Sequence, residues 1–185
     1  MMRDINFDNI HLVVPDMTYM DSYRAAWDSY RAHGVEDFVY PDVATKRKAM
    51  AYLKKIENFR RGIDMPKGYV PSSGFWLVDG RHYLGSGDVR HYLNDNLRRF
   101  GGNIGYSINP MFWRLGLGTI MLSLLLIEAK RLRIARPIIT CFDGNLASAK
   151  IIEKNGGVLL NKVNNRLRGA DRLTRIYEID LTRQP

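Results

Sequence analysis

The chain contains almost no cysteine and no long hydrophobic run, and both shortages limit the kinds of protein it can be. Cys141 is the single cysteine among 185 residues, which excludes an internal disulfide and favours a reducing compartment. The N-terminus shows no apolar segment of the secretory type. The most hydrophobic stretch, 115–127, contains two glycines and is far shorter than the roughly 20 apolar residues of a membrane-spanning helix. We therefore expect a cytoplasmic protein that has no membrane partner.

Negative charge is also scarce, because 28 Lys and Arg residues stand against 19 Asp and Glu residues and give a net charge of +9. Such a balance attracts anions in general, including nucleotide-like cofactors. The basic residues are scattered along the chain, however, and no dense basic block with interleaved aromatic residues or zinc-finger spacing is found. We therefore expect neither a nucleic-acid partner nor a metal ion.

The order of apolar patterns predicts a single domain over residues 1–185. Residues 1–72 have the helical spacing of apolar side chains, with one helix over 17–33 and a second from Asp42, as its N-cap, to Arg60. Residues 73–185 are dominated by strand patterns. The elements predicted there are strands over 74–78, 83–92, 103–108, 137–142, 158–163 and 174–181, and helices over 119–133 and 146–155. This order predicts an α/β (α+β) fold with one mixed sheet and helices on both faces.

The most informative segment, 105–119, predicts a strand that stops at a proline, turns through Gly-x-Gly and leads into a long apolar helix. The first N–H groups of a helix have no partner within it, and the helix dipole places partial positive charge there. Gly116 and Gly118 permit positive φ and a close approach to the backbone, and Arg114 adds a full charge. The segment therefore predicts a cradle for a phosphate or diphosphate.

Together with a second motif, this turn resembles the GNAT superfamily of acyl-CoA-dependent N-acetyltransferases, from about Trp76 to the C-terminus. The superfamily signature is Gln or Arg, two variable residues, Gly, one variable residue, then Gly or Ala. Trp113 stands at the Gln/Arg position, and the register continues through Arg114, Leu115, Gly116, Leu117, Gly118 and Thr119. The second motif matches at Asn145, Ser148 and the closing pair Gly156–Gly157. Segments 89–94 and 101–106 resemble a bacterial group of predicted acetyltransferases within the superfamily.

The resemblance implies a mostly antiparallel sheet in which a parallel strand pair, ending at Ile108 and near Phe142, splays apart to hold acetyl-CoA as co-substrate. It implies that the diphosphate lies on the backbone of 113–119 and that the Ile108 backbone N–H polarises the thioester carbonyl. Ser148 belongs to the cofactor-binding set that it implies. Asn145 either contacts the cofactor arm or caps its own helix, and both interpretations stay open.

Catalytic side chains are less evident in the sequence. Many superfamily members carry a glutamate on the strand corresponding to 103–108, but this strand has no carboxylate. We therefore consider residues on neighbouring strands as the general base, chiefly His91 and Asp88, and less so the acids of the last strand. Many members also have a tyrosine seven residues after the helix-opening Asn, where this chain has Ile152. Because no His/Asp pair is evident to activate Cys141, we expect direct transfer to the amine.

The resemblance predicts transfer of an acetyl group from acetyl-CoA to a primary amine of a small molecule or peptide. The alternative is a non-catalytic acyl-CoA-binding or sensor module, favoured by the missing acid and strand carboxylate. Aromatic residues with helical spacing in the first helix are expected to form core. The residues expected to wall an acceptor pocket are Phe38, Tyr40 and Trp76. The oligomeric state is open between monomer and homodimer.

Overall fold

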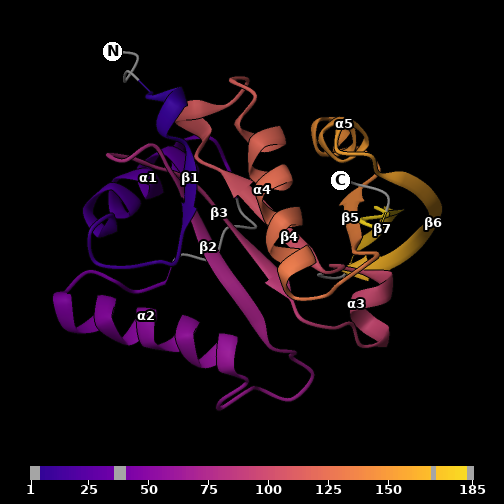
Figure 1. Ribbon diagram of the computed structural model, residues 1–185, viewed down its shortest axis with the longest axis horizontal. Coiled ribbons are helices and arrows are strands. Elements are labelled where there is room, and N and C mark those ends of the chain that lie inside the picture. The colour runs from indigo at the N-terminus through magenta and orange to yellow at the C-terminus, as the bar shows by residue number, and fades with distance from the viewer. Residues whose placement is uncertain (1–4, 36–40, 168–169, 183–185) are drawn as a thin grey trace.

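The fold consists of two antiparallel sheets joined by helices, as seen in a computed structural model that describes residues 5–35, 41–167 and 170–182 (Figure 1). The first sheet has the order β1-β2-β3-β4 and the second the order β5-β7-β6. The strands of the first sheet are β1 (His11–Val13), β2 (Ser72–Val78), β3 (Tyr83–Arg90) and β4 (Ile104–Ile108). Those of the second are β5 (Ile138–Phe142), β6 (Val158–Leu167) and β7 (Ala170–Glu178).

Helices cover both faces of the first sheet. The N-terminal helices are α1 (Met20–Ala32) and α2 (Lys46–Arg61), and the later ones are α3 (Asp95–Arg99), α4 (Leu117–Arg131) and α5 (Leu146–Lys154). Short 3-10 turns η1 (Phe7–Asn9) and η2 (Pro110–Phe112) precede β1 and α4. No helix in the described part of the chain is both long and apolar enough to cross a membrane.

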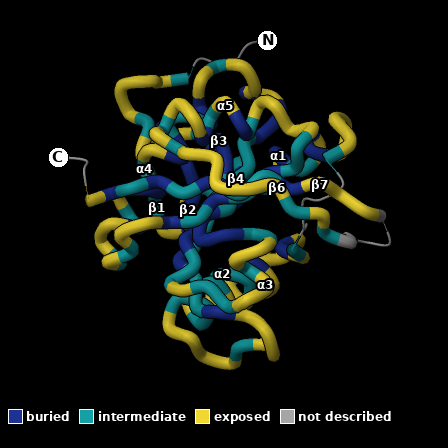
Figure 2. The backbone as a smooth tube through the Cα atoms, turned by 90° about the vertical axis from the view of Figure 1, so that its right-hand side faces the viewer, coloured by how far each residue is buried: buried dark blue, intermediate teal, exposed yellow. Residues whose placement is uncertain are grey.

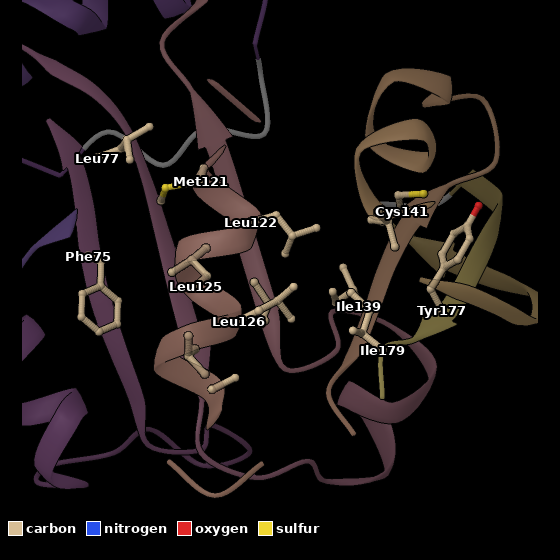
Figure 3. Close-up of a cluster of buried hydrophobic side chains, with 14 of the residues drawn as sticks. Phe75, Leu77, Met121, Leu122, Leu125, Leu126, Ile139, Cys141, Tyr177 and Ile179 are labelled. Atoms are coloured by element: carbon tan, nitrogen blue, oxygen red, sulfur yellow. The ribbon is translucent and has the colours of Figure 1, made fainter. Parts of the chain in front are cut away.

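Helix α4 forms the centre of the larger core, between the two sheets. Met121 and Leu125 point toward Leu77 on β2, while Leu122 and Leu126 point toward β5 (Figure 3). All five side chains are buried, which explains why α4 has no strongly polar face. Figure 2 shows buried backbone along the strands of the first sheet at the centre, and the hairpin of β6 and β7 largely exposed toward its turn.

The opposite face of the first sheet packs against α1 and α2 through an aromatic cluster. Trp76 on β2 stacks on Tyr23 of α1 with ring centroids 4.5 Å apart, and Tyr83 lies edge-on to both rings. Tyr23 and Tyr30 are almost fully buried, so the expected core role of the first helix's aromatic residues is confirmed for them. Because Phe75 and Leu77 face α4 while Trp76 and Val78 face α1, β2 is buried on both sides.

The sheets part between β4 and β5, where the sequence predicts the splayed strand pair. The two strands begin side by side, since the Asn103 N–H donates to the Ile138 carbonyl at 2.6 Å and the Ile138 N–H donates to Asn103 Oδ1 at 2.9 Å. Beyond these bonds, no ladder joins β4 to β5 within the described ranges. The single mixed sheet of the sequence prediction is therefore interrupted along β4, and the splay between β4 and β5 is called the cleft below.

Other boundaries differ from the sequence predictions for local reasons. Helix α2 is capped by Thr45, whose Oγ1 accepts from the Lys48 N–H, and not by Asp42. Asp42 instead forms an ion pair with Lys48. Helix α3 was not predicted, because five residues contain too little apolar periodicity. Strands β6 and β7 form a longer hairpin than expected, since mutual pairing compensates for a polar sequence.

Candidate active site

The turn before α4 has the backbone geometry of an anion cradle. Arg114 and Gly116 both adopt positive φ, 65° and 80°, and Gly116 is the N-cap of α4. Positive φ at these two residues alternates with the ordinary φ of Leu115 between them. Such an alternation directs successive N–H groups to one side, where the unpaired first-turn amides of α4 also point. A Cβ placed on Gly116 would meet no atom within 4 Å, so the space in front of the turn is open. These residues fit a diphosphate.

Gly118 has a role different from the one predicted, because it lies inside α4 and does not adopt positive φ. It is buried, and a Cβ there would lie 2.6 Å from Cδ1 of Ile151 on α5. Gly118 therefore allows α4 and α5 to pack closely. The positive φ expected of it is taken by Arg114 instead.

Trp113 connects the cradle to the end of β4. Its Nε1 donates to the Ile108 carbonyl at 2.9 Å, and its half-exposed indole lies edge-on to His33. The turn between them is fixed by Asn109, whose Oδ1 accepts from the Met111 N–H. A residue that departs from the superfamily signature thus holds the strand end in place. The remaining predicted cradle residues are Leu115 and Leu117, which pack in the core, and Thr119, whose N–H donates to Gly116 within the first turn.

The Ile108 N–H points into the cleft. The Asn109 N–H donates to the Leu84 carbonyl on β3 at 2.9 Å, which makes this a hydrogen-bonded pair of the ladder. Paired and unpaired positions alternate in an antiparallel ladder, so the backbone groups of Ile108 and Tyr106 point away from β3, toward β5. The Ile108 amide is therefore available to a carbonyl oxygen in the cleft.

Helix α5 brings further polar groups to the other side of the cleft. Asn145 caps α5, with Oδ1 accepting from the Ser148 N–H at 3.0 Å. The capping interpretation is thus correct, and it leaves the Asn145 Nδ2 without an acceptor in the described part of the chain. Ser148 Oγ lies 3.1 Å from the Tyr106 hydroxyl. Ile152 is fully buried in the core and carries no exchangeable proton.

Tyr106 is a residue of the cleft to which the sequence analysis assigned no catalytic role. It projects from β4 toward α5, and burial raises the pKa of its hydroxyl to about 12 although the Ser148 hydrogen bond opposes the shift. At neutral pH the phenol is therefore protonated. The only signal in the sequence was its spacing of two from Ile108, which places both on one face of the strand.

Asp88 lies on the opposite face of the sheet, next to the edge strand. It pairs across the ladder with Gly105 of β4, and its carboxylate would contact any side chain there, since a Cβ on Gly105 would lie 2.9 Å from Oδ1. Burial raises the pKa of Asp88, while Arg90, whose Nη2 lies 3.4 Å from Oδ2, opposes the rise. Arg90 is itself fixed by two hydrogen bonds to the carbonyls of Gly101 and Gly102.

His91 lies farther from the cleft than Asp88. Its Nε2 lies 3.0 Å from Ser73 Oγ, and its N–H donates to the Pro71 carbonyl. Burial, followed by the nearby Arg60, lowers the pKa of the imidazole. Because His91 follows Gly85, the partner of Ile108, by six residues, the two are separated by roughly 20 Å along the sheet.

A cavity of about 750 Å³ opens between α2 and the face of β2, β3 and β4. Aromatic residues of α2 and β2 form its walls, and Asp88 also lines it. The cavity reaches β4 at Gly105, Tyr106 and Ser107. Trp76, which was expected to wall an acceptor pocket, lines this cavity, whereas Phe38 and Tyr40 lie outside the described residues. Among residues 5–35, 41–167 and 170–182, no three His, Cys, Asp or Glu side chains gather as metal ligands would.

A helix-end turn with the geometry of an anion cradle, beside the splayed end of β4, is the arrangement that the resemblance to acyl-CoA-dependent transferases predicted. The chain matches the family model described as "Acetyltransferase (GNAT) domain" over residues 14–158, and it belongs to this family. It is therefore an acyltransferase, and acetyl-CoA is its co-substrate. No functionally curated protein matches the chain in sequence.

Solved structures with the same fold cover nearly the whole chain. The microcin self-immunity acetyltransferase MccE, in complex with acetyl-CoA and AMP, is 15% identical with a TM-score of 0.68, over 94% of this chain and 93% of MccE. RimL, a ribosomal-protein α-N-acetyltransferase in complex with coenzyme A, is 16% identical with a TM-score of 0.68, over 95% and 97%. A GNAT-family acetyltransferase from Bacillus anthracis is 15% identical with a TM-score of 0.64, over 96% and 98%. At these identities the likeness concerns the fold.

Proposed function

We propose that the protein is an N-acetyltransferase that moves the acetyl group of acetyl-CoA directly to a primary amine of a small molecule or peptide. The observation that carries this proposal is that cleft and cavity share β4. The Ile108 amide faces the cleft, while Gly105 and Ser107 of the same strand line the cavity. A donor in the cleft and an acceptor in the cavity would therefore meet at one strand. RimL, an α-N-acetyltransferase by its description, supports an amine as the acceptor.

The cradle and cleft hold the donor in this proposal. The turn from Trp113 to Thr119 binds the diphosphate through its amides and Arg114. The strand edge of β4 binds the pantetheine arm as an added strand would be bound, and Asn145 donates from Nδ2. The Ile108 N–H donates to the thioester carbonyl oxygen and stabilises the negative charge that develops there.

Asp88 is the general base that we favour, because it alone of the two candidates lines the cavity. Burial raises the pKa of Asp88 and so brings it closer to the pKa of the ammonium group that it must deprotonate. Gly105, opposite Asp88, precedes Ile108 by three residues, about 10 Å along the strand. Proton transfer therefore uses a water relay, and the hydroxyls of Ser86 and Ser107, which form a cross-strand pair between these points, line its path.

The Tyr106–Ser148 hydroxyl pair is the proton source for the leaving thiolate in place of a tyrosine at position 152. The amine nitrogen forms the new C–N bond and loses one proton through the relay to Asp88. The C–S bond then breaks, its electron pair goes to sulfur, and Ser148 Oγ donates a proton that the Tyr106 hydroxyl replaces. Solvent then reprotonates the phenol and takes the proton from Asp88, which restores both groups and completes the cycle.

The test is a calorimetric titration with acetyl-CoA, with NAD and ATP as controls, followed by measurement of CoA release with a panel of amines. We expect selective acetyl-CoA binding and amine-dependent release. Binding without turnover on any amine would instead identify a non-catalytic acyl-CoA-binding or sensor module.

We also assign the protein to the cytoplasm, because its one cysteine is unpaired and buried.

A further inference from the structure

The cavity between α2 and the first sheet has an apolar middle. Tyr52 and Phe59 contribute rings from α2, and Trp76 contributes a ring from β2. Where the cavity reaches β3 and β4, it is lined by Gly87 and by the small residues Ser86 and Ser107, so backbone and hydroxyl groups replace the rings there. Ring walls of this kind favour a flat apolar body over a long flexible chain.

The charges of the cavity are separated between its two sides. The sheet side carries Asp88, the only acidic lining residue contributed by a strand, and its ion-pair partner Arg90 does not line the cavity. The α2 side carries Lys48 and Lys55. Lys48 is neutralised by its ion pair with Asp42. Lys55 has no carboxylate within ion-pair distance in the described part of the chain, and its ammonium lies 5.8 Å from the centre of the Phe59 ring.

From this arrangement we infer that the acceptor is a small amphoteric molecule, in which a flat aromatic body separates a primary amine from an acidic group. The inference rests on the proposed function. Asp88 receives the amine next to β4, the rings hold the body, and the Lys55 ammonium pairs with the acidic group at the mouth. A carboxylate and a phosphonate could each form this ion pair with the Lys55 ammonium. A polyamine is disfavoured, because its second positive charge would meet Lys55 instead of an anion.

The experiment compares matched amines on the protein saturated with acetyl-CoA. The probes are 4-(aminomethyl)benzoate, its methyl ester, 4-(aminomethyl)phenylphosphonate, spermidine and a peptide with a free N-terminus. We expect kcat/KM for the carboxylate or the phosphonate to exceed that for the ester at least tenfold, and the relative values identify the preferred acid. Calorimetric titration of the acid and ester into the complex with coenzyme A provides the same comparison without turnover.

Lys55→Gln tests the residue that carries the preference, and Lys54→Gln is the matched control, since Lys54 is an exposed neighbour on α2 that does not line the cavity. Lys55→Gln should reduce the acid-to-ester ratio to below threefold, while Lys54→Gln keeps it. An ester that matches the acid, or an unchanged ratio in Lys55→Gln, overturns the inference. Turnover of spermidine or the peptide but not of the two acids also overturns the inference, although the proposed acetyltransferase function is then retained. If coenzyme A binds but no amine is acetylated, the proposed function fails, and the calorimetric comparison then decides the ligand class alone.

Discussion

At the scale of single residues, the site depends on groups whose properties are set by neighbouring strands. Asp88 projects from β3 over a glycine of β4, so a carboxylate reaches the edge strand although that strand has none of its own. Tyr106 and Ser148 bring hydroxyls together from β4 and α5. Under the proposed function, a group that the resemblance expects at one sequence position is in both cases supplied by a different element.

Replacing Asp88 by Asn should lower kcat about 100-fold, the lower range of general-base contributions. The base works when deprotonated, and burial raises the pKa of Asp88 above the ordinary aspartate value near 3.9. Wild-type kcat/KM should therefore rise with pH through this elevated pKa and then level off, and the variant should lose that acid limb. The measurement is a pH profile of CoA release.

Two controls accompany the Asp88 variant. Asp95→Asn removes an exposed carboxylate at the start of α3 and should leave the profile unchanged. His91→Ala should cost less than threefold, because the imidazole lies far along the sheet from Ile108. A loss in His91→Ala equal to that in Asp88→Asn would move the base to the histidine.

Replacing Tyr106 by Phe should slow acetyl transfer about 100-fold in single-turnover measurements and leave acetyl-CoA affinity within twofold, because only the proton source is removed. Tyr177→Phe is the matched control. The hydroxyl of Tyr177, on β7, donates to Glu153 of α5 at 2.9 Å. Loss of this hydroxyl should cost about 1 kcal/mol of stability and no activity. Equal rates in Tyr106→Phe and the wild type would contradict the role of the hydroxyl pair.

At the scale of elements, the strand–turn–α4 unit was the best predicted part of the site. Pro110, Gly116 and the apolar run after it are strong local signals, so the sequence alone located the turn before α4. The positive φ of Arg114 had no such signal, because arginine has no preference for it. The cross-strand pairing of Asp88 with Gly105 could not be predicted either, since register depends on the whole sheet.

Gly116→Ala tests the cradle turn. Alanine at a φ of 80° costs about 1–2 kcal/mol, and relief of that strain would turn the amides away from the diphosphate. We expect acetyl-CoA affinity to fall at least fivefold by calorimetry. Gly34→Ala is the control, because Gly34 has a φ of 62° and equally open surroundings after α1. It should lose similar stability on denaturation and no affinity, and equal affinity of both variants would exclude Gly116 from the cradle.

At the scale of the whole molecule, fold class followed from element order, whereas the break between the sheets did not follow from any one residue. It arises because backbone pairing between β4 and β5 stops after Asn103 and Ile138 in the described part of the chain, while α4 keeps both sheets in one core. Under the proposed function, donor and acceptor sites thus lie on opposite faces of one continuous body.

Ligand binding should therefore stabilise the molecule as a unit. At a hundredfold excess over Kd, acetyl-CoA contributes about 2.7 kcal/mol, which corresponds to a rise in Tm of about 5–10 °C for a chain of this size. Thermal unfolding followed by circular dichroism measures it. NAD at the same concentration should leave Tm unchanged, and a rise with both ligands would indicate unspecific binding to the basic surface.

The burial of α4 between the two sheets also has a consequence for hydrogen exchange. Side chains of this helix pack against β2 on one side and β5 on the other, so neither sheet can lose the helix without exposing the larger core. The backbone amides of its middle turns should then exchange with deuterium only through global opening, at the slowest rate in the chain. Its first turn, which borders the cradle, should exchange quickly in the free protein and become as slow as the middle turns when acetyl-CoA is bound.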